Sequence, residues 1–238
     1  MMKKTFLNKW VIFMPLVAAV CFSACKKEVA DSPTVSTVAH KSSHHDKYRP
    51  FKMSSETFPR INPIAPFDLK EPAGMKGYAN AVGWGKGNAT YMGKIKNWFN
   101  QLAYSPTGAD PTVGTTLAPI VDALKYPVLG GPLPLIQKND FKELRKANKW
   151  LKIPVSVNGM IVNSVIYNDK GDALFTSLTT DAKLVFVSPT RINFSAQGKF
   201  VGGRGKFVKA KGTYTQTGYF NPQNFNDAEY HIDGKITY

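Results

Sequence analysis

Residues 191–219, RINFSAQGKFVGGRGKFVKAKGTYTQTGY, decide the class of fold that we expect for this chain. From Ile192 to Phe200, apolar or small residues occupy every second position, and polar residues stand between them. This period of two predicts a β-strand with one buried and one solvated face. Residues 201–205 break the pattern with glycines, as a hairpin turn requires, and alternation resumes over residues 206–219. The stretch therefore predicts a β-hairpin within a barrel or a sandwich.

The same alternation recurs along the rest of the chain. Short turn-forming sequences separate many of the alternating segments, which favours an up-and-down β-barrel. On one face of residues 77–85 only glycine and alanine occur, so we expect another group to pack closely against that strand. The further strands that we expect cover residues 76–85, 90–101, 153–168, 173–179, 183–187 and 228–238.

The N-terminus is typical of an export signal, which we place at residues 1–24. Three lysines precede an apolar core over residues 11–22, which is shorter than the ~20 residues of a membrane-spanning helix. Residues 20–26, VCFSACK, resemble a bacterial lipobox, with Phe22 where leucine is usual. That resemblance implies cleavage before Cys25 and acylation of its thiol, and hence a permanent lipid anchor. The alternative is an ordinary secretory signal with a stray cysteine.

A lipidated Cys25 would place the protein on a bacterial membrane. Residues 26–28, KKE, resemble the export tag of surface lipoproteins in Bacteroidota, so we expect the outer membrane, on its periplasmic or cell-surface side. The formal net charge is +15, and loss of the three signal lysines leaves +12 (15 − 3). In an exported protein this charge favours anionic envelope lipids or glycans over nucleic acid as partners. The simpler interpretation, which we prefer, is that lysine solubilises the outer faces of the strands.

We expect residues 25–58 to form a flexible tether, because they are polar and carry little periodic apolar sequence. Within them His44, His45 and Asp46, with His40 upstream, offer ligands for a metal ion. A solvated tract is the better interpretation because nothing fixes their geometry, and we predict no metal or cofactor. The barrel domain then covers residues 59–238, entered through a proline-rich extended segment.

Residues 104–151 differ in composition and predict a proline-rich, partly helical insertion between strands. Residues 116–124 and 140–150 both place apolar side chains at helical spacing. The second segment is a basic amphipathic helix, with Asp140 and Glu143 spaced as a capping box. We expect its apolar stripe to pack on its own domain, with a membrane or a partner as the alternative. Long insertions often carry binding sites.

Three segments together resemble sequences of the allene oxide cyclase and dirigent β-barrel superfamily, including its uncharacterised bacterial members. They are residues 87–94, GNATYMGK, residues 202–214, GGRGKFVKAKGTY, and residues 233–238, DGKITY. The resemblance implies an all-β fold, an eight-stranded antiparallel barrel with an apolar lumen open at one end. Plant members are a cyclase that acts on a fatty-acid epoxide and proteins that orient phenolic radicals. The matched positions are scaffold glycines, and Tyr91 stands where bacterial relatives often have histidine, so no catalytic residue is carried over.

The sequence offers little catalytic chemistry of its own. HExxH and GxSxG motifs are absent, and the glycines of residues 83–88 lack the ending of a phosphate-binding loop. His231 lies between Glu229 and Asp233, whose carboxylates would raise its pKa and suit a general base. Alternation places all three on the outer face of the last strand, where an exposed charge ladder is the better interpretation. We therefore predict no catalytic residue and lean away from an enzyme.

Three functions remain open. The first is a lipid-anchored envelope protein whose barrel binds a small apolar or aromatic molecule, with Phe194, Phe200, Tyr214 and Tyr230 as candidate lining residues. The second is a structural or interaction lipoprotein whose barrel is packed with its own side chains. The third is an isomerase or cyclase like the plant proteins, which would need a polar group inside the barrel. An open lumen favours the first or the third function.

Overall fold

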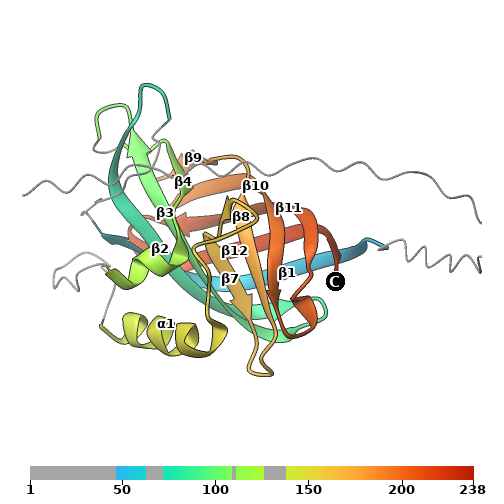
Figure 1. Ribbon diagram of the computed structural model, residues 1–238. Helices are drawn as coiled ribbons and strands as arrows, with labels where there is room; N and C mark the ends of the chain where they lie inside the picture. Colours follow the sequence, from blue (N-terminus) through green and yellow to red (C-terminus); the bar gives the residue numbers. More distant parts are fainter. Residues whose placement is uncertain (1–46, 63–71, 109–110, 126–137) are drawn as a thin grey trace, which may run out of the picture. The chain divides into compact units, whose positions relative to one another are not determined.

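The protein forms a closed eight-stranded antiparallel β-barrel, seen in the computed structural model of Figure 1. The structure describes residues 47–62, 72–108, 111–125 and 138–238. The predicted fold class is therefore confirmed. The signal, Cys25 and the histidine tract of residues 40–46 lie outside the described residues.

Six long strands make most of the wall, in the order β10-β11-β12-β1-β2-β3. The gap between β3 and β10 is closed by two short pairs, β7 with β8 at one end of the barrel and β4 with β9 at the other. A separate two-stranded ribbon, β5 with β6, precedes β7. The strands are β1 (Arg49–Asn62), β2 (Lys76–Ala89), β3 (Gly93–Ser105), β4 (Gly114–Leu117), β5 (Ser156–Val157), β6 (Met160–Ile161), β7 (Ser164–Tyr167), β8 (Ala173–Leu178), β9 (Ala182–Ser188), β10 (Arg191–Arg204), β11 (Lys211–Asn221) and β12 (Asn224–Thr237).

The hairpin predicted from residues 191–219 is present, but its turn lies further along the chain. Strand β10 runs on to Arg204, because Gly202 and Gly203 pair with β8 after a bulge that follows Phe200. The connection to β11 is a short 3-10 helix, η2 (Gly205–Phe207), which starts at a glycine with φ of +60°. The glycines thus mark a bulge and a helical turn instead of a tight two-residue loop.

The prediction of a tether over residues 25–58 is wrong from Arg49 onward. Strand β1 begins there and pairs with both β12 and β2. Phe51, Met53, Ser55 and Thr57 are buried on its inner face, and the residues between them are exposed. Half of these inner side chains are small and polar, so the alternation of apolar and polar residues that marks a strand is weak in this segment. The barrel domain therefore begins about ten residues before the predicted boundary at residue 59.

The insertion is partly helical, as predicted, although one of its two helices is placed wrongly. Helix α1 (Lys138–Leu151) matches the predicted helix of residues 140–150. Residues 116–124 instead divide between β4 and a 3-10 helix, η1 (Ile120–Lys125). Residues 114–117 form a strand instead of a helix because β4 pairs with both β3 and β9 and so helps to close the barrel. Among the described residues, none of the helices has the length and apolar content needed to span a bilayer.

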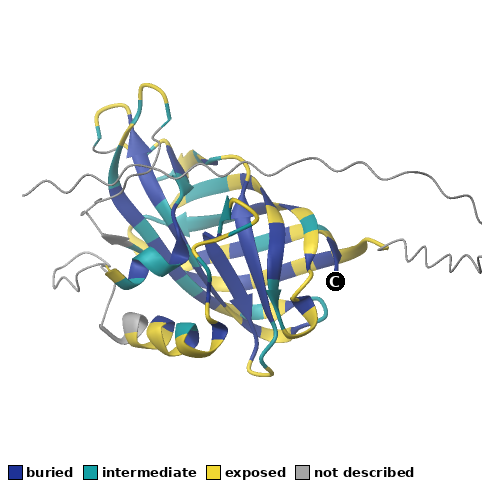
Figure 2. Ribbon diagram, viewed as in Figure 1, coloured by how far each residue is buried: buried dark blue, intermediate teal, exposed yellow. Residues whose placement is uncertain are grey.

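Two apolar cores hold the fold together. The outer core lies between the helices η1 and α1 and the outer faces of β2, β3, β7 and β8, and it includes Leu144, Ala147 and Leu151 of α1. The inner core fills one end of the barrel, which we call the closed end, with residues such as Phe51, Phe200 and Ile236. Strands β7 and β8 are therefore buried on both faces, whereas the basic side of α1 is exposed (Figure 2). The stripe of α1 packs on its own domain.

Candidate functional site, a cavity in the barrel

The other end of the barrel contains a cavity of about 860 Å³. It opens beside the short strands β4 and β9, where Phe186 is 68% exposed. Its volume falls within the range of small-molecule sites, roughly 300–1,000 Å³. The aromatic side chains that line it are Tyr78, Phe99, Phe186, Phe194, Tyr219, Phe220, Phe225 and Tyr230.

Small residues on β2 leave the room for this cavity. Ala79 and Ala81 line it, and the neighbouring Gly83 lies under the ring of Phe99. A Cβ atom at Gly83 would lie 2.1 Å from Cζ of Phe99. The glycine and alanine face predicted from the sequence therefore does receive a closely packed group, an aromatic ring from the neighbouring strand β3.

Three rings meet at the inner end of the cavity, which we call its floor. The Tyr230 ring centroid lies 6.3 Å from that of Phe99 and 6.2 Å from that of Phe194. The Tyr230 hydroxyl donates a hydrogen bond of 3.0 Å to Oε1 of Gln216. Both residues are almost fully buried and both line the cavity. The floor thus combines aromatic surface with a polar pair.

The four candidate lumen residues all point into the barrel, but at two depths. Phe194 and Tyr230 line the cavity. Phe200 and Tyr214 are not among its lining residues and lie in the inner core of the closed end, with ring centroids 5.1 Å apart. Phe200 also meets Phe51 of β1 edge to face at 5.0 Å. Alternation predicted the direction of these side chains but not their depth.

The ionisable groups near the floor are neutral. Burial raises the pKa of Tyr230 well above its ordinary value, and the nearby Tyr214 hydroxyl raises it further. Burial also raises the pKa of Tyr214. Among the described lining residues, Arg60 is the one with a formally charged side chain, and it stands near the mouth. Its guanidinium donates to the Pro59 carbonyl at 3.0 Å and to Oδ1 of Asn226 at 3.4 Å.

The mouth carries exposed apolar surface. Beyond Leu184, the backbone of β9 pairs with β10 alone, and Val185 and Val187 are more than half exposed. Two strands along from Phe186, on β11, Phe220 stacks with Phe225 at a ring-centroid distance of 5.8 Å. These residues give an apolar entry to the cavity.

His231 lies outside the barrel, as the alternation predicted. Its ring is 43% exposed, and Nε2 lies 3.2 Å from Oε2 of Glu229. Asp233 is 3.6 Å from the Lys52 ammonium instead. Among the described residues, no three His, Cys, Asp or Glu side chains cluster in a way that could hold a metal ion.

Sequence reasoning missed several lining residues. Gln216 continues the inward row of β11 two positions after Tyr214, so alternation alone points to it. Ser164 gave no such signal, because every residue of β7 is buried and the strand shows no polar face. Phe186 stands between Val185 and Val187, which are also apolar, so alternation does not show which of these side chains faces the cavity.

Comparison of the chain with protein-family models, with curated proteins and with solved structures finds no match. The class of protein is therefore defined by its fold and cavity, a closed eight-stranded antiparallel barrel with an aromatic-lined cavity at one end. The resemblance to the allene oxide cyclase and dirigent superfamily stays a prediction.

Proposed function

We propose that this is a lipid-anchored protein of the bacterial cell envelope whose barrel binds a small apolar or aromatic molecule. The observation that supports it most is the cavity of about 860 Å³, enclosed by aromatic and aliphatic side chains of the barrel wall. Removing apolar ligand surface from water contributes about 25 cal/mol per Å², which is the main driving force for occupying such a space.

The cavity weakens the case for a purely structural lipoprotein. A packed barrel would fill its own interior, as the inner core does at the closed end. At the mouth end the described side chains leave the interior open. A function that uses this opening accounts for it better than a function based on the outer surface alone.

An isomerase or cyclase is the second candidate, and the Tyr230–Gln216 pair is the observation that favours it. A catalytic acid or base works best with a pKa near the operating pH. Burial shifts the pKa of Tyr230 away from that range, and no Asp, Glu, Lys or His is found among the described residues that line the cavity. Binding is therefore the better supported function.

The lipid anchor rests on the lipobox-like sequence around Cys25. Metabolic labelling with radioactive palmitate in a bacterial host tests it, with Cys25→Ala as the comparison. We expect label on the natural chain and none on the variant. Equal labelling of both, or of neither, would contradict the anchor.

Ligand binding is tested on the mature chain with Cys25→Ser, purified without detergent. We expect native mass spectrometry to show a non-covalent adduct that denaturation removes, and the uncharged dye N-phenyl-1-naphthylamine to fluoresce on binding. Ala81→Phe, which projects a ring into the cavity, should weaken dye binding at least tenfold. Thr217→Phe, on the exposed face of β11, is the matched control. A dye that fails to bind the parent chain, together with a clean apo mass, would contradict the function.

A further inference from the structure

The floor of the cavity contains a buried hydroxyl without a partner. Ser164 is 2% exposed and lines the cavity, and its Oγ atom has no hydrogen-bond partner among the described residues. A buried polar group left in this way loses its hydrogen bonds to water without replacing them, so native proteins rarely leave one. The aromatic wall does not explain this hydroxyl.

The register of the strands places Ser164 beside the other polar groups of the floor. Ser164 pairs with Phe99 of β3, whose ring faces Tyr230, and Tyr230 in turn donates to Gln216. Ser164, Tyr230 and Gln216 all line the same cavity. They form a small polar patch at the inner end of an otherwise apolar space.

More polar atoms without partners lie directly below this patch. Thr176 pairs with Ser164 across β7 and β8, and its hydroxyl lies near that of Tyr214 without hydrogen-bonding geometry. Nδ2 of Asn97 also has no partner, although Oδ1 of Asn97 accepts a hydrogen bond of 2.7 Å from Ser55. The middle of the barrel is therefore richer in hydrogen-bonding capacity than its own side chains satisfy.

We propose that the floor binds an uncharged oxygen group, a hydroxyl or a carbonyl, at the buried end of an apolar or aromatic ligand. This inference rests on the proposed binding function. The ligand enters with its oxygen first, and its apolar body remains against the aromatic wall nearer the mouth.

The charges around the cavity exclude an ionised group at the floor. A carboxylate placed there would meet no cation, because Arg60 stands near the mouth and the floor tyrosines hold their protons. Burial of an uncompensated charge costs far more than burial of a neutral hydroxyl that finds a partner. The floor therefore selects neutral ligands.

The donors and acceptors of the floor favour a hydroxyl over a carbonyl. Oε1 of Gln216 is engaged by Tyr230, so the amide nitrogen of Gln216 is the part that donates to a ligand. The Tyr230 hydroxyl already donates its hydrogen bond to Gln216, so its oxygen can accept one from a ligand, and Ser164 can both donate and accept. A ligand hydroxyl uses both kinds of group, whereas a carbonyl uses the donors alone.

Three compounds of one shape test the inference, namely 2-naphthol, 2-methylnaphthalene and 2-naphthoate. Each is titrated against the mature Cys25→Ser chain loaded with N-phenyl-1-naphthylamine. We expect 2-naphthol to displace the dye at about a fivefold lower concentration than 2-methylnaphthalene, as one net hydrogen bond of about 1 kcal/mol implies. We expect 2-naphthoate to be the weakest competitor.

The variant Ser164→Ala removes the proposed partner without changing the shape of the floor. It should abolish most of the advantage of 2-naphthol over 2-methylnaphthalene, with each displacement corrected for the affinity of the variant for the dye. Ser195→Ala, on the exposed face of β10, is the matched control and should keep that advantage. Circular dichroism of both variants checks that the barrel remains folded.

The outcomes separate this inference from the function on which it rests. Equal displacement by all three compounds, or the tightest binding by 2-naphthoate, overturns the inference and leaves ligand binding intact. An unchanged preference in Ser164→Ala also overturns it, because water or another group then satisfies the floor. A chain that binds neither the dye nor the three compounds overturns the binding function itself.

Discussion

Because its buried tyrosine hydroxyls resist ionisation, this barrel should lose stability at alkaline pH. Burial raises the folded-state pKa of Tyr214 and Tyr230, and it raises the pKa of Tyr167 to about 12. Below pH 10 these groups are protonated in both the folded and the unfolded chain. Above pH 10 the unfolded chain loses their protons first, so stability falls as pH rises toward the folded-state values.

We expect the urea midpoint of unfolding to fall steeply between pH 10 and pH 11.5. Each buried tyrosine contributes about 1.4 kcal/mol per pH unit in that window. Tyr230→Phe should therefore lessen the slope, whereas Tyr48→Phe, at a residue that is 59% exposed, should leave it unchanged. The same slope in Tyr230→Phe as in the parent chain would show that burial does not hold this proton.

Two glycines of β2 predict different effects of the same substitution. A Cβ at Gly83 meets the far end of the Phe99 ring at 2.1 Å, and the cavity gives that ring space to move. A Cβ at Gly87 meets the backbone oxygen of Ser54 at 1.9 Å, which cannot move without breaking the pairing of β1 with β2. One change reshapes the cavity, and the other strains the wall.

We expect Gly87→Ala to lower the free energy of unfolding by about 1–3 kcal/mol and Gly83→Ala to cost less. Binding of N-phenyl-1-naphthylamine should change in the opposite order, weakening several-fold in Gly83→Ala and little in Gly87→Ala. Urea titrations and dye titrations on the two variants measure both quantities. Equal losses in both assays would contradict the assignment of Phe99 to the cavity wall.

At the scale of elements, β1 shows what alternation can and cannot predict. The hairpin of β10 and β11 was recognisable because large apolar side chains mark its inner face. Strand β1 alternates as regularly, but Ser55 and Thr57 occupy inward positions in the polar middle of the barrel. A single sequence does not distinguish such a strand from a polar tether, since the pattern depends on what the interior contains.

The residues of the site, like the strands, were predictable only where alternation marks one face as apolar and the other as polar. Phe194 and Tyr230 follow from alternation, because each belongs to a strand with one exposed face. Ser164 does not, since the outer core covers β7 from outside and hides its inner face in the sequence. The cavity itself depends on the short strands β4 and β9, whose pairing brings together residues far apart along the chain.

The pairing of β1 predicts where the chain can be shortened. A chain that begins at Lys47 keeps all of β1 and should unfold cooperatively in urea. A chain that begins at Phe58 loses Phe51 and Met53 and opens the edges of β2 and β12, so it should be insoluble or unfold without a cooperative transition. Equal stability of the two chains would show that β1 is not part of the barrel.

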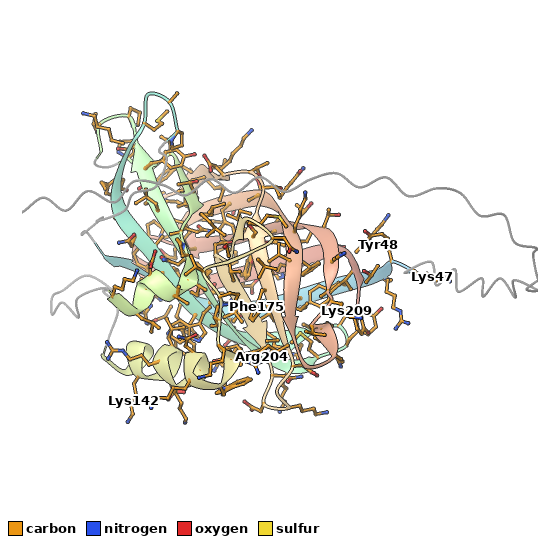
Figure 3. The ribbon with its side chains drawn as sticks, in the orientation of Figure 1. Lys47, Tyr48, Lys142, Phe175, Arg204 and Lys209 are labelled. Atoms are coloured by element: carbon orange, nitrogen blue, oxygen red, sulfur yellow. The ribbon has the colours of Figure 1, made fainter. Side chains whose placement is uncertain are left out.

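At the scale of the whole molecule, several basic residues lie at the closed end of the barrel. Arg49 begins β1 there, and its guanidinium lies 5.5 Å from the ring centroid of Tyr238, which packs on Phe207. Exposed Val208 and Lys209 follow Phe207 directly. Figure 3 shows Lys47, Tyr48 and Lys209 at this end, away from Lys142 of α1. The described chain begins at Lys47 and enters the barrel at this end.

A lipid anchor joined to this end would hold a basic surface with exposed Tyr48 and Val208 against the membrane. We expect the unlipidated mature chain to sediment with vesicles rich in phosphatidylglycerol, less so at high salt, and hardly with phosphatidylcholine vesicles. The double variant Lys209→Glu/Lys211→Glu should weaken this binding at least about tenfold, since each basic residue near the surface contributes about 1 kcal/mol.

The matched control reverses the same number of exposed charges on α1, with Lys146→Glu/Lys149→Glu. It should bind the anionic vesicles as tightly as the parent chain, because α1 covers the side of the barrel and not its closed end. Equal weakening by both pairs would show that net charge alone drives the binding. Loss with the α1 pair alone would identify the helix as the membrane-facing surface, and the closed end would then face away from the lipid.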